Sequence, residues 1–245
     1  MPDGSGFPFS TDRHVHLNGR DWGLLVASLA LGFGLLTALP QMAFPASLIP
    51  PLLFMGIPLL SLRLVAGQHW VALFGRVGLR QVALMVLFGA LTLVVSLSVG
   101  LLLARVAPLS ANPFADRMQD LSAGQLAMLL IPTIPQLIGE ELLGILPFLA
   151  TLWLCIGRFG LSQGWGVICG VMVSASVFGA AHLPTYDWNW AQALIGIGSA
   201  RVVLTLAYVV TRSLWVSAGA HVLNDWTGFL AAFAFGHLPI GADPI

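Results

Sequence analysis

Apolar residues occur in long runs separated by short polar stretches, and each run is near the length that crosses a lipid bilayer. A membrane-spanning helix needs about 20 predominantly apolar residues. Seven segments meet this requirement: residues 22–39, 46–66, 81–104, 125–156, 164–182, 190–210 and 214–235. The pattern predicts an all-α fold, a polytopic transmembrane helical bundle of about seven or eight spans.

The fourth segment is too long for one straight span. Pro132, Pro135 and Pro147 interrupt it, and proline removes a helical hydrogen bond and clashes with the preceding turn. We therefore expect this segment to be kinked or split into two shorter helices. The polar stretch before it, residues 108–125, is expected to lie at the membrane surface with a short helix.

Composition agrees with a lipid environment and excludes several classes of function. The chain is 58% hydrophobic and 8% charged, and it has no lysine and only two glutamates. Such a chain cannot cover a water-facing surface with charge. The net charge of zero and the scattered arginines exclude a nucleic-acid partner. The two cysteines lack metal-binding or redox spacing. The lipid bilayer itself is thus the first expected partner.

Arginines are distributed unequally between the two sides of the predicted bundle. With seven spans, Arg105 and Arg117 fall on one side, whereas the other side carries Arg13, Arg20, Arg63, Arg76, Arg80, Arg158 and Arg212. The positive-inside rule then places the N-terminus in the cytoplasm. We expect a bacterial inner membrane, a polar arm over residues 1–21, and one transmembrane domain over residues 22–245 with its chemical motifs in 125–235.

Both glutamates of the chain, Glu140 and Glu141, stand side by side in the long fourth segment. A charged side chain at the bilayer centre costs roughly 2.5–3.5 kcal/mol on insertion scales. Adjacent helical residues point about 100° apart, so one glutamate can face a cavity while the other finds a partner behind it. The alternative is a protonated pair that hydrogen-bonds between helices.

Two further clusters of polar residues follow on later spans. His182 ends an apolar segment, with Phe178 four residues earlier on the same helical face. His221, Asn224 and Asp225 share one face of the last segment. These groups suit a metal site or the placement of a water molecule and an oxyanion. They could also form a polar contact between helices.

Arg201 lies within the sixth segment and requires an anionic partner or a route to water. Asp225 and Glu141 are the candidate partners. Together the polar groups would suffice for peptide hydrolysis by an activated water. Glu140, His182 and His221 could instead bind zinc, or the groups could form a proton pathway in a transporter. The residues alone leave these alternatives open.

Three of these motifs give the chain its resemblance to a known family. Glu140-Glu141, Phe178-x-x-x-His182 and His221-x-x-x-Asp225 follow one another on successive spans. They resemble the CPBP family, the CAAX-protease and bacteriocin-processing (Abi) membrane proteins that include the Ras-converting CAAX endopeptidases. The resemblance covers roughly residues 125–235.

The resemblance implies an intramembrane endopeptidase with an all-helical fold and a peptide or membrane-protein substrate. Glu140 would activate the attacking water with the help of His182, and His221 and Asp225 would stabilise the oxyanion. Glu141 and Asn224 would support them. We favour a glutamic protease without a cofactor over a zinc protease, because the glutamate pair supplies a base by itself.

The chain departs from the family at one point. The family's first motif usually reads Glu-Glu-x-x-x-Arg followed by glycine, and Ile145 and Leu146 occupy these last two places. We hypothesise that Arg201 supplies the missing charge and lies within about 8 Å, a Debye length, of a glutamate or of Asp225. If nothing replaces the arginine, a non-catalytic CPBP-like membrane partner or immunity protein becomes the alternative. A proton-coupled transporter is less favoured, because the first three spans contain almost no polar residues.

Overall fold

The computed structural model describes residues 6–10, 15, 17–118 and 121–237. This part of the chain is helical and contains no strand. Its main helices are α1 (Gly19–Ala38), α2 (Ile49–Ala66), α3 (Leu79–Leu103), α4 (Pro113–Asp116), α5 (Ala123–Leu130), α6 (Thr133–Trp153), α7 (Gln163–Ala181), α8 (Gly198–Thr211) and α9 (Leu214–Gly236). Short 3₁₀ or π turns extend several of them, namely η1 (Ala46–Leu48), η2 (Gly67–Leu73), η3 (Leu154–Arg158), η4 (Pro184–Tyr186) and η5 (Ala191–Ile197).

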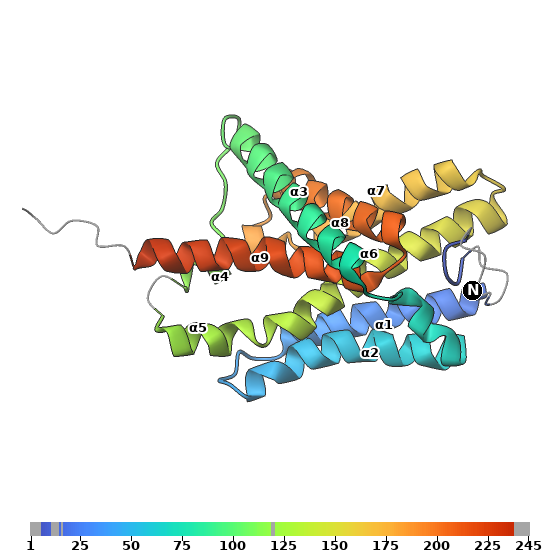
Figure 1. Ribbon diagram of the computed structural model, residues 1–245, viewed down its shortest axis with the longest axis horizontal. Coiled ribbons are helices and arrows are strands. Elements are labelled where there is room, and N and C mark those ends of the chain that lie inside the picture. The colour runs from blue at the N-terminus through green and yellow to red at the C-terminus, as the bar shows by residue number, and fades with distance from the viewer. Residues whose placement is uncertain (1–5, 11–14, 16, 119–120, 238–245) are drawn as a thin grey trace, which may run out of the picture.

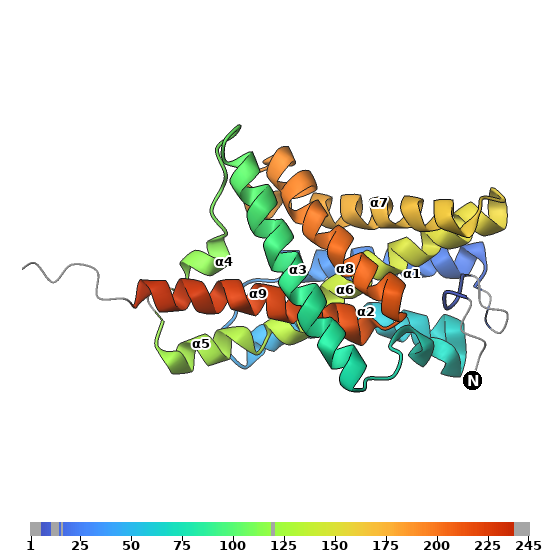
Figure 2. The same ribbon diagram turned by 45° about the horizontal axis from the view of Figure 1, so that its top comes forward.

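Most of the helices run along the long axis of the molecule, while α3 and α8 cross it obliquely (Figures 1 and 2). The α6 helix is central and packs against α1, α2, α7, α8 and α9. In the apolar window of the α5–α6 segment 67% of residues are buried, compared with 11% in α3. Residues on α6 are therefore shielded by protein, whereas most of α3 is not covered by the rest of the protein.

Among the described residues, six helical segments are long and apolar enough to cross a membrane, and the expected all-α transmembrane bundle is confirmed. The seventh expected span, α9, is also long, but polar residues including His221, Asn224 and Asp225 lower its hydropathy. It runs along the long axis, displaced toward one end relative to α1, α2 and α7 (Figure 1). The start of α1 and the end of α9 lie toward opposite ends of the molecule (Figure 1).

The fourth predicted segment is split into two helices, as expected, and the split occurs at only one of its three prolines. The helix is interrupted at Ile131 and Pro132, between α5 and α6. Pro135 lies in the first turn of α6, where its missing N–H has no helical partner to lose. Pro147 lies inside α6 without ending it. The short surface helix expected before this segment is α4.

The N-terminal arm differs from the polar segment expected from the sequence. Phe7 and Phe9 are almost completely buried, because the arm folds back against the ends of the helices. The Phe7 ring meets Phe148 of α6 edge-on, with 5.3 Å between ring centroids. The first span also begins earlier than expected, at Gly19, because the Asn18 side chain caps the helix by accepting hydrogen bonds from the backbone N–H groups of Arg20 and Asp21.

Candidate active site

Glu140 and Glu141 lie near the middle of α6 and point in different directions. Glu141 has no exposed surface, whereas Glu140 is 8% exposed and lines a cavity of about 410 Å³. Neighbouring helical residues diverge by about 100°, and this divergence separates the two carboxylates. One glutamate thus faces open space while the other faces the protein interior, as the sequence predicted.

Four donors surround the Glu141 carboxylate. Arg201 of α8 binds it through both terminal nitrogens, Nη1 to Oε1 at 2.7 Å and Nη2 to Oε2 at 2.9 Å. The Ser217 hydroxyl also donates to Oε2, and His221 Nδ1 lies 2.9 Å from Oε1. A buried ion pair is tolerated only when its remaining hydrogen-bonding capacity is satisfied, and this carboxylate meets that condition.

A gap on α6 gives Arg201 room to reach Glu141. A Cβ atom at Gly144 would lie 2.7 Å from the Arg201 Cζ atom, closer than real contacts allow. Behind the guanidinium, Arg201 Nε donates to Thr205 Oγ1 at 3.1 Å. The hypothesis that Arg201 lies beside a glutamate is confirmed. Of the two candidate partners, Glu141 rather than Asp225 receives it.

His182 follows the last residue of α7 and faces the cavity. Its Nδ1 lies 2.8 Å from the Phe178 carbonyl oxygen, and a carbonyl only accepts hydrogen bonds, so Nδ1 carries a proton. The other ring nitrogen, Nε2, lies 4.0 Å from Glu140 Oε2. The Phe178 ring packs against the imidazole with 4.6 Å between centroids. Phe178 therefore orients His182 with both its backbone and its side chain.

His221 of α9 connects the two glutamates. Because Glu141 accepts from Nδ1, the opposite nitrogen Nε2 points into the cavity, 3.8 Å from Glu140 Oε2 and 3.7 Å from Asp225 Oδ1. Asn224 Nδ2 donates to Asp225 Oδ1 at 2.8 Å. Within the described chain, the buried Asn224 Oδ1 has no hydrogen-bond partner.

The predicted polar residues converge instead of forming separate helix contacts. One cavity is lined by Glu140, Phe178, His182, His221, Asn224 and Asp225. Glu141 and Arg201 lie directly behind it, in contact with His221 or with each other. Three helices, α6, α7 and α9, thus bring side chains from distant parts of the sequence to one place, and α8 contributes the arginine.

Three further cavity residues were not anticipated from the sequence. Gln136, one turn before Glu140, donates from Nε2 to Glu140 Oε1 at 3.0 Å. Thr133 accepts a hydrogen bond from the Trp226 indole at 3.0 Å. Tyr186 of η4 lines the same cavity. The i, i+4 spacing of Gln136 and Glu140 was a readable signal, whereas Tyr186 follows a turn that the sequence does not define.

Burial determines the state of Tyr186. Loss of water around the phenol, together with the nearby Asp225 and Glu140 carboxylates, raises the pKa of Tyr186 to about 12. The side chain therefore remains a neutral hydrogen-bond donor throughout the physiological pH range.

Metal binding by the expected set, Glu140, His182 and His221, can be compared with this geometry. Among the residues described, no group of three or more His, Cys, Asp or Glu side chains is arranged to hold a metal ion. His221 Nδ1 is used by Glu141, an arrangement also typical of histidines that bind a metal through the other nitrogen. The preference for a reaction without a cofactor therefore stays a prediction.

Comparison with known families gives one match, which covers the part of the chain that carries the site. Residues 122–227, from just before α5 into α9, match the family described as type II CAAX prenyl endopeptidase Rce1-like. This match covers less than half of the chain and supports the CPBP (CAAX-protease) assignment expected from its motifs. No curated protein and no solved structure shows a significant match to the chain.

Proposed function

We propose that the protein is an intramembrane endopeptidase in which Glu140 activates water to hydrolyse a peptide bond of a membrane-presented polypeptide. One observation carries this proposal: the Glu140 carboxylate faces the Nε2 atoms of His182 and His221 across the cavity, at 4.0 and 3.8 Å. These separations exceed direct hydrogen bonds and fit groups joined through one water molecule. The match of residues 122–227 to a family described as an endopeptidase supports the same reaction.

In the first step, a water held between Glu140 and His182 gives a proton to the Glu140 carboxylate. Its oxygen forms a bond to the scissile carbonyl carbon, and the carbonyl oxygen becomes an oxyanion. The Phe178 carbonyl keeps the proton of His182 on Nδ1, so Nε2 can accept a hydrogen bond from the same water. A positioned carboxylate base typically contributes a factor of about 10²–10⁴ in rate.

In the second step, the oxyanion accepts hydrogen bonds from Asn224 Nδ2 and from Nε2–H of His221, which donates there as an imidazolium because its Nδ1–H is used by Glu141. Asp225 orients Asn224 by accepting from its amide. Tyr186 offers a further neutral donor in the same cavity. The tetrahedral intermediate then collapses, the C–N bond breaks, and the proton taken by Glu140 passes to the departing amine. The products are a carboxylic acid and an amine, so the step needs no further reactant.

Glu141 and Arg201 position the reacting groups in this proposal. Glu141 accepts from His221 Nδ1 and thereby directs His221 Nε2 toward the cavity. Arg201 holds Glu141 by two charge-assisted hydrogen bonds. In this way a guanidinium from α8 takes the place that the family motif usually gives to the residue at Ile145.

The absence of an arginine at Ile145 favoured the alternative of a non-catalytic relative. Measuring the cleavage of membrane proteins in cells distinguishes the endopeptidase from the non-catalytic relative. Newly formed termini of membrane proteins are compared between cells with the natural chain, with Glu140→Gln and with Asp187→Asn, a matched acid-to-amide control on an exposed turn outside the cavity. The enzyme predicts termini that disappear only in Glu140→Gln. Identical termini in all three strains would favour the non-catalytic partner.

A further inference from the structure

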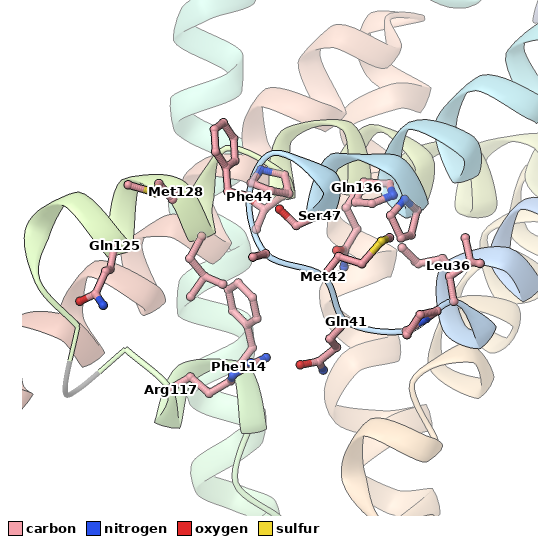
Figure 3. Close-up of a pocket in the computed structure, with 18 of the residues that line it drawn as sticks. Leu36, Gln41, Met42, Phe44, Ser47, Phe114, Arg117, Gln125, Met128 and Gln136 are labelled. Atoms are coloured by element: carbon pink, nitrogen blue, oxygen red, sulfur yellow. The ribbon is translucent and has the colours of Figure 1, made fainter.

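A second and larger cavity adjoins the candidate active site. It has a volume of about 820 Å³ and lies between the connection from α1 to α2, the end of α4 and helix α5 (Figure 3). We call it the outer cavity. Phe114, Thr133 and Gln136 line both the outer cavity and the cavity that contains Glu140. The two spaces are therefore neighbours that share one wall.

The shared wall leads directly to the carboxylate. Gln136 lines the outer cavity and donates a hydrogen bond to Glu140. Thr133, one turn earlier on α6, is held by the Trp226 indole of α9. A chain bound in the outer cavity would thus reach the carboxylate past Gln136, along the face of α6 that both cavities share.

The lining defines what the outer cavity can bind. Most of it is apolar, and its side chains include Leu36, Leu39, Met42, Phe44, Met128 and Leu129. The amides of Gln41, Gln125 and Gln136 are spaced among them. Apolar walls with a few amide groups fit a polypeptide, whose side chains fill the walls and whose main chain pairs with amides. A lipid acyl chain would leave those amides without partners.

The charge of the lining also restricts which polypeptide segments can bind in the outer cavity. Arg117 is the one formally charged side chain among the described residues that line the outer cavity. A carboxylate on the bound chain is favoured beside it, and a basic side chain is disfavoured.

We propose that the outer cavity binds the substrate polypeptide on one side of the scissile bond, as an extended, mainly apolar segment that lacks lysine and arginine. This inference rests on the proposed endopeptidase function and adds the substrate class and the residues that select it. Gln136 contacts both the bound segment and the catalytic carboxylate, so binding in the outer cavity and cleavage are coupled through one side chain.

Two variants fill the outer cavity without touching the proposed catalytic groups: Ser47→Trp and Met42→Trp. Leu52→Trp is the matched control, because Leu52 lies nearby in the first turn of α2, is exposed and does not line the outer cavity. Each purified protein is placed in lipid nanodiscs and given a library of peptides from a digested proteome, and the cleaved positions are determined by mass spectrometry.

The inference predicts that the natural chain selects apolar residues at several consecutive positions on one side of the cleaved bond and avoids Lys and Arg there. The filling variants should lose this selection and cleave the preferred peptides roughly tenfold more slowly or worse, a change of about 1.4 kcal/mol. Selection on the other side of the bond should remain. Leu52→Trp should behave as the natural chain does. Cleavage with unchanged selection in both filling variants overturns the inference and leaves the enzyme intact.

A binding experiment keeps the inference distinct from catalysis. The inactive Glu140→Gln protein carries a photoreactive benzophenone side chain at Met128, and a biotinylated decapeptide of leucine and alanine is the probe. Cross-linking to the decapeptide that Ser47→Trp abolishes supports the cavity as a polypeptide site. Cross-linking to lipid alone overturns it, whatever the peptide library shows. Peptide binding without any cleavage by the natural chain contradicts the proposed function and overturns the substrate role that depends on it.

Discussion

Arg201 and Glu141 form a bidentate ion pair in which neither side chain has any exposed surface. The pair joins α8 to α6 across 60 positions of sequence. It lies directly behind His221, which shares the same carboxylate. The position of a proposed catalytic imidazole is therefore set by a buried charge pair that itself does not reach the cavity.

Removal of Arg201 should be costly, because it leaves a buried carboxylate without its counter-charge. We expect Arg201→Met to destabilise the protein by about 3–5 kcal/mol, the range for breaking a buried pair on one side. The double variant Arg201→Met with Glu141→Leu should recover much of this stability and remain inactive, because His221 Nδ1 loses its acceptor. Unfolding in a denaturing detergent, measured with cleavage activity, tests both statements. Activity of the double variant near that of the natural chain would show that the pair does not position the site.

Gly144 should be intolerant of even one methyl group. A Cβ atom there would lie within 2.8 Å of Arg201 Nη1 and Nε, so Gly144→Ala must displace the guanidinium. We expect reduced cleavage activity together with lower stability. Gly34→Ala on α1 is the control, since a Cβ atom there has no neighbour within 4 Å and alanine is favoured over glycine in a helix by roughly 0.5–1 kcal/mol. Equal behaviour of the two variants would contradict the role given to this gap.

Tyr186 should resist ionisation. Its pKa is raised to about 12 in the folded protein, compared with about 10 for a free tyrosine. Because the folded protein holds the Tyr186 proton more tightly than the unfolded chain does, this difference favours the folded state at pH values below about 10. The favourable contribution to the free energy of unfolding is then lost as the pH rises from about 10 through 12. In a Tyr208→Phe background Tyr186 is the sole tyrosine, and its phenolate absorbance near 295 nm should stay low at pH 10.5. Half-ionisation near pH 10 in the folded protein would show an exposed phenol.

The arginines predict the orientation in the membrane. Among described residues, Arg20, Arg63, Arg76, Arg80, Arg158 and Arg212 lie where α1, α3 and α9 begin or where α2, η3 and α8 end. Arg105 and Arg117 follow α3 and α4. The positive-inside rule places the first group in the cytoplasm, and the outer cavity then opens on the opposite face. Alkaline phosphatase fused after α9 should be active, and the same enzyme inserted between η3 and α7 should be inactive. The reverse pattern would invert the topology.

The fold could be predicted from sequence largely because lipid imposes length and hydropathy on every span. The segment limits agreed within a few residues for α2, α3 and α7, and the order of the motifs placed Glu140, His182 and His221 on three helices. Other features depend on packing that a linear pattern does not contain. The choice of Glu141 over Asp225 as the partner of Arg201 follows from the gap at Gly144. The burial of Phe7 follows from the arm folding back.

Metal dependence separates the two forms of the proposed reaction. In the glutamic form, the base is Glu140 itself, so activity should survive dialysis against a zinc chelator and should not rise when zinc is restored. The control is a zinc peptidase treated in the same way. Activity that falls with chelation and returns with zinc would assign Glu140, His182 and His221 to a metal site formed by rearrangement of the cavity.

The most direct test is the cleavage rate of the purified protein in lipid nanodiscs with Glu140→Gln compared with the natural chain and with Asp187→Asn. Folded protein is confirmed for each by its unfolding transition. The account predicts that Glu140→Gln lowers kcat by about 10²–10⁴, the contribution of a general base, while Asp187→Asn leaves it unchanged. A Glu140→Gln protein that cleaves as fast as the natural chain would contradict the central role of this carboxylate.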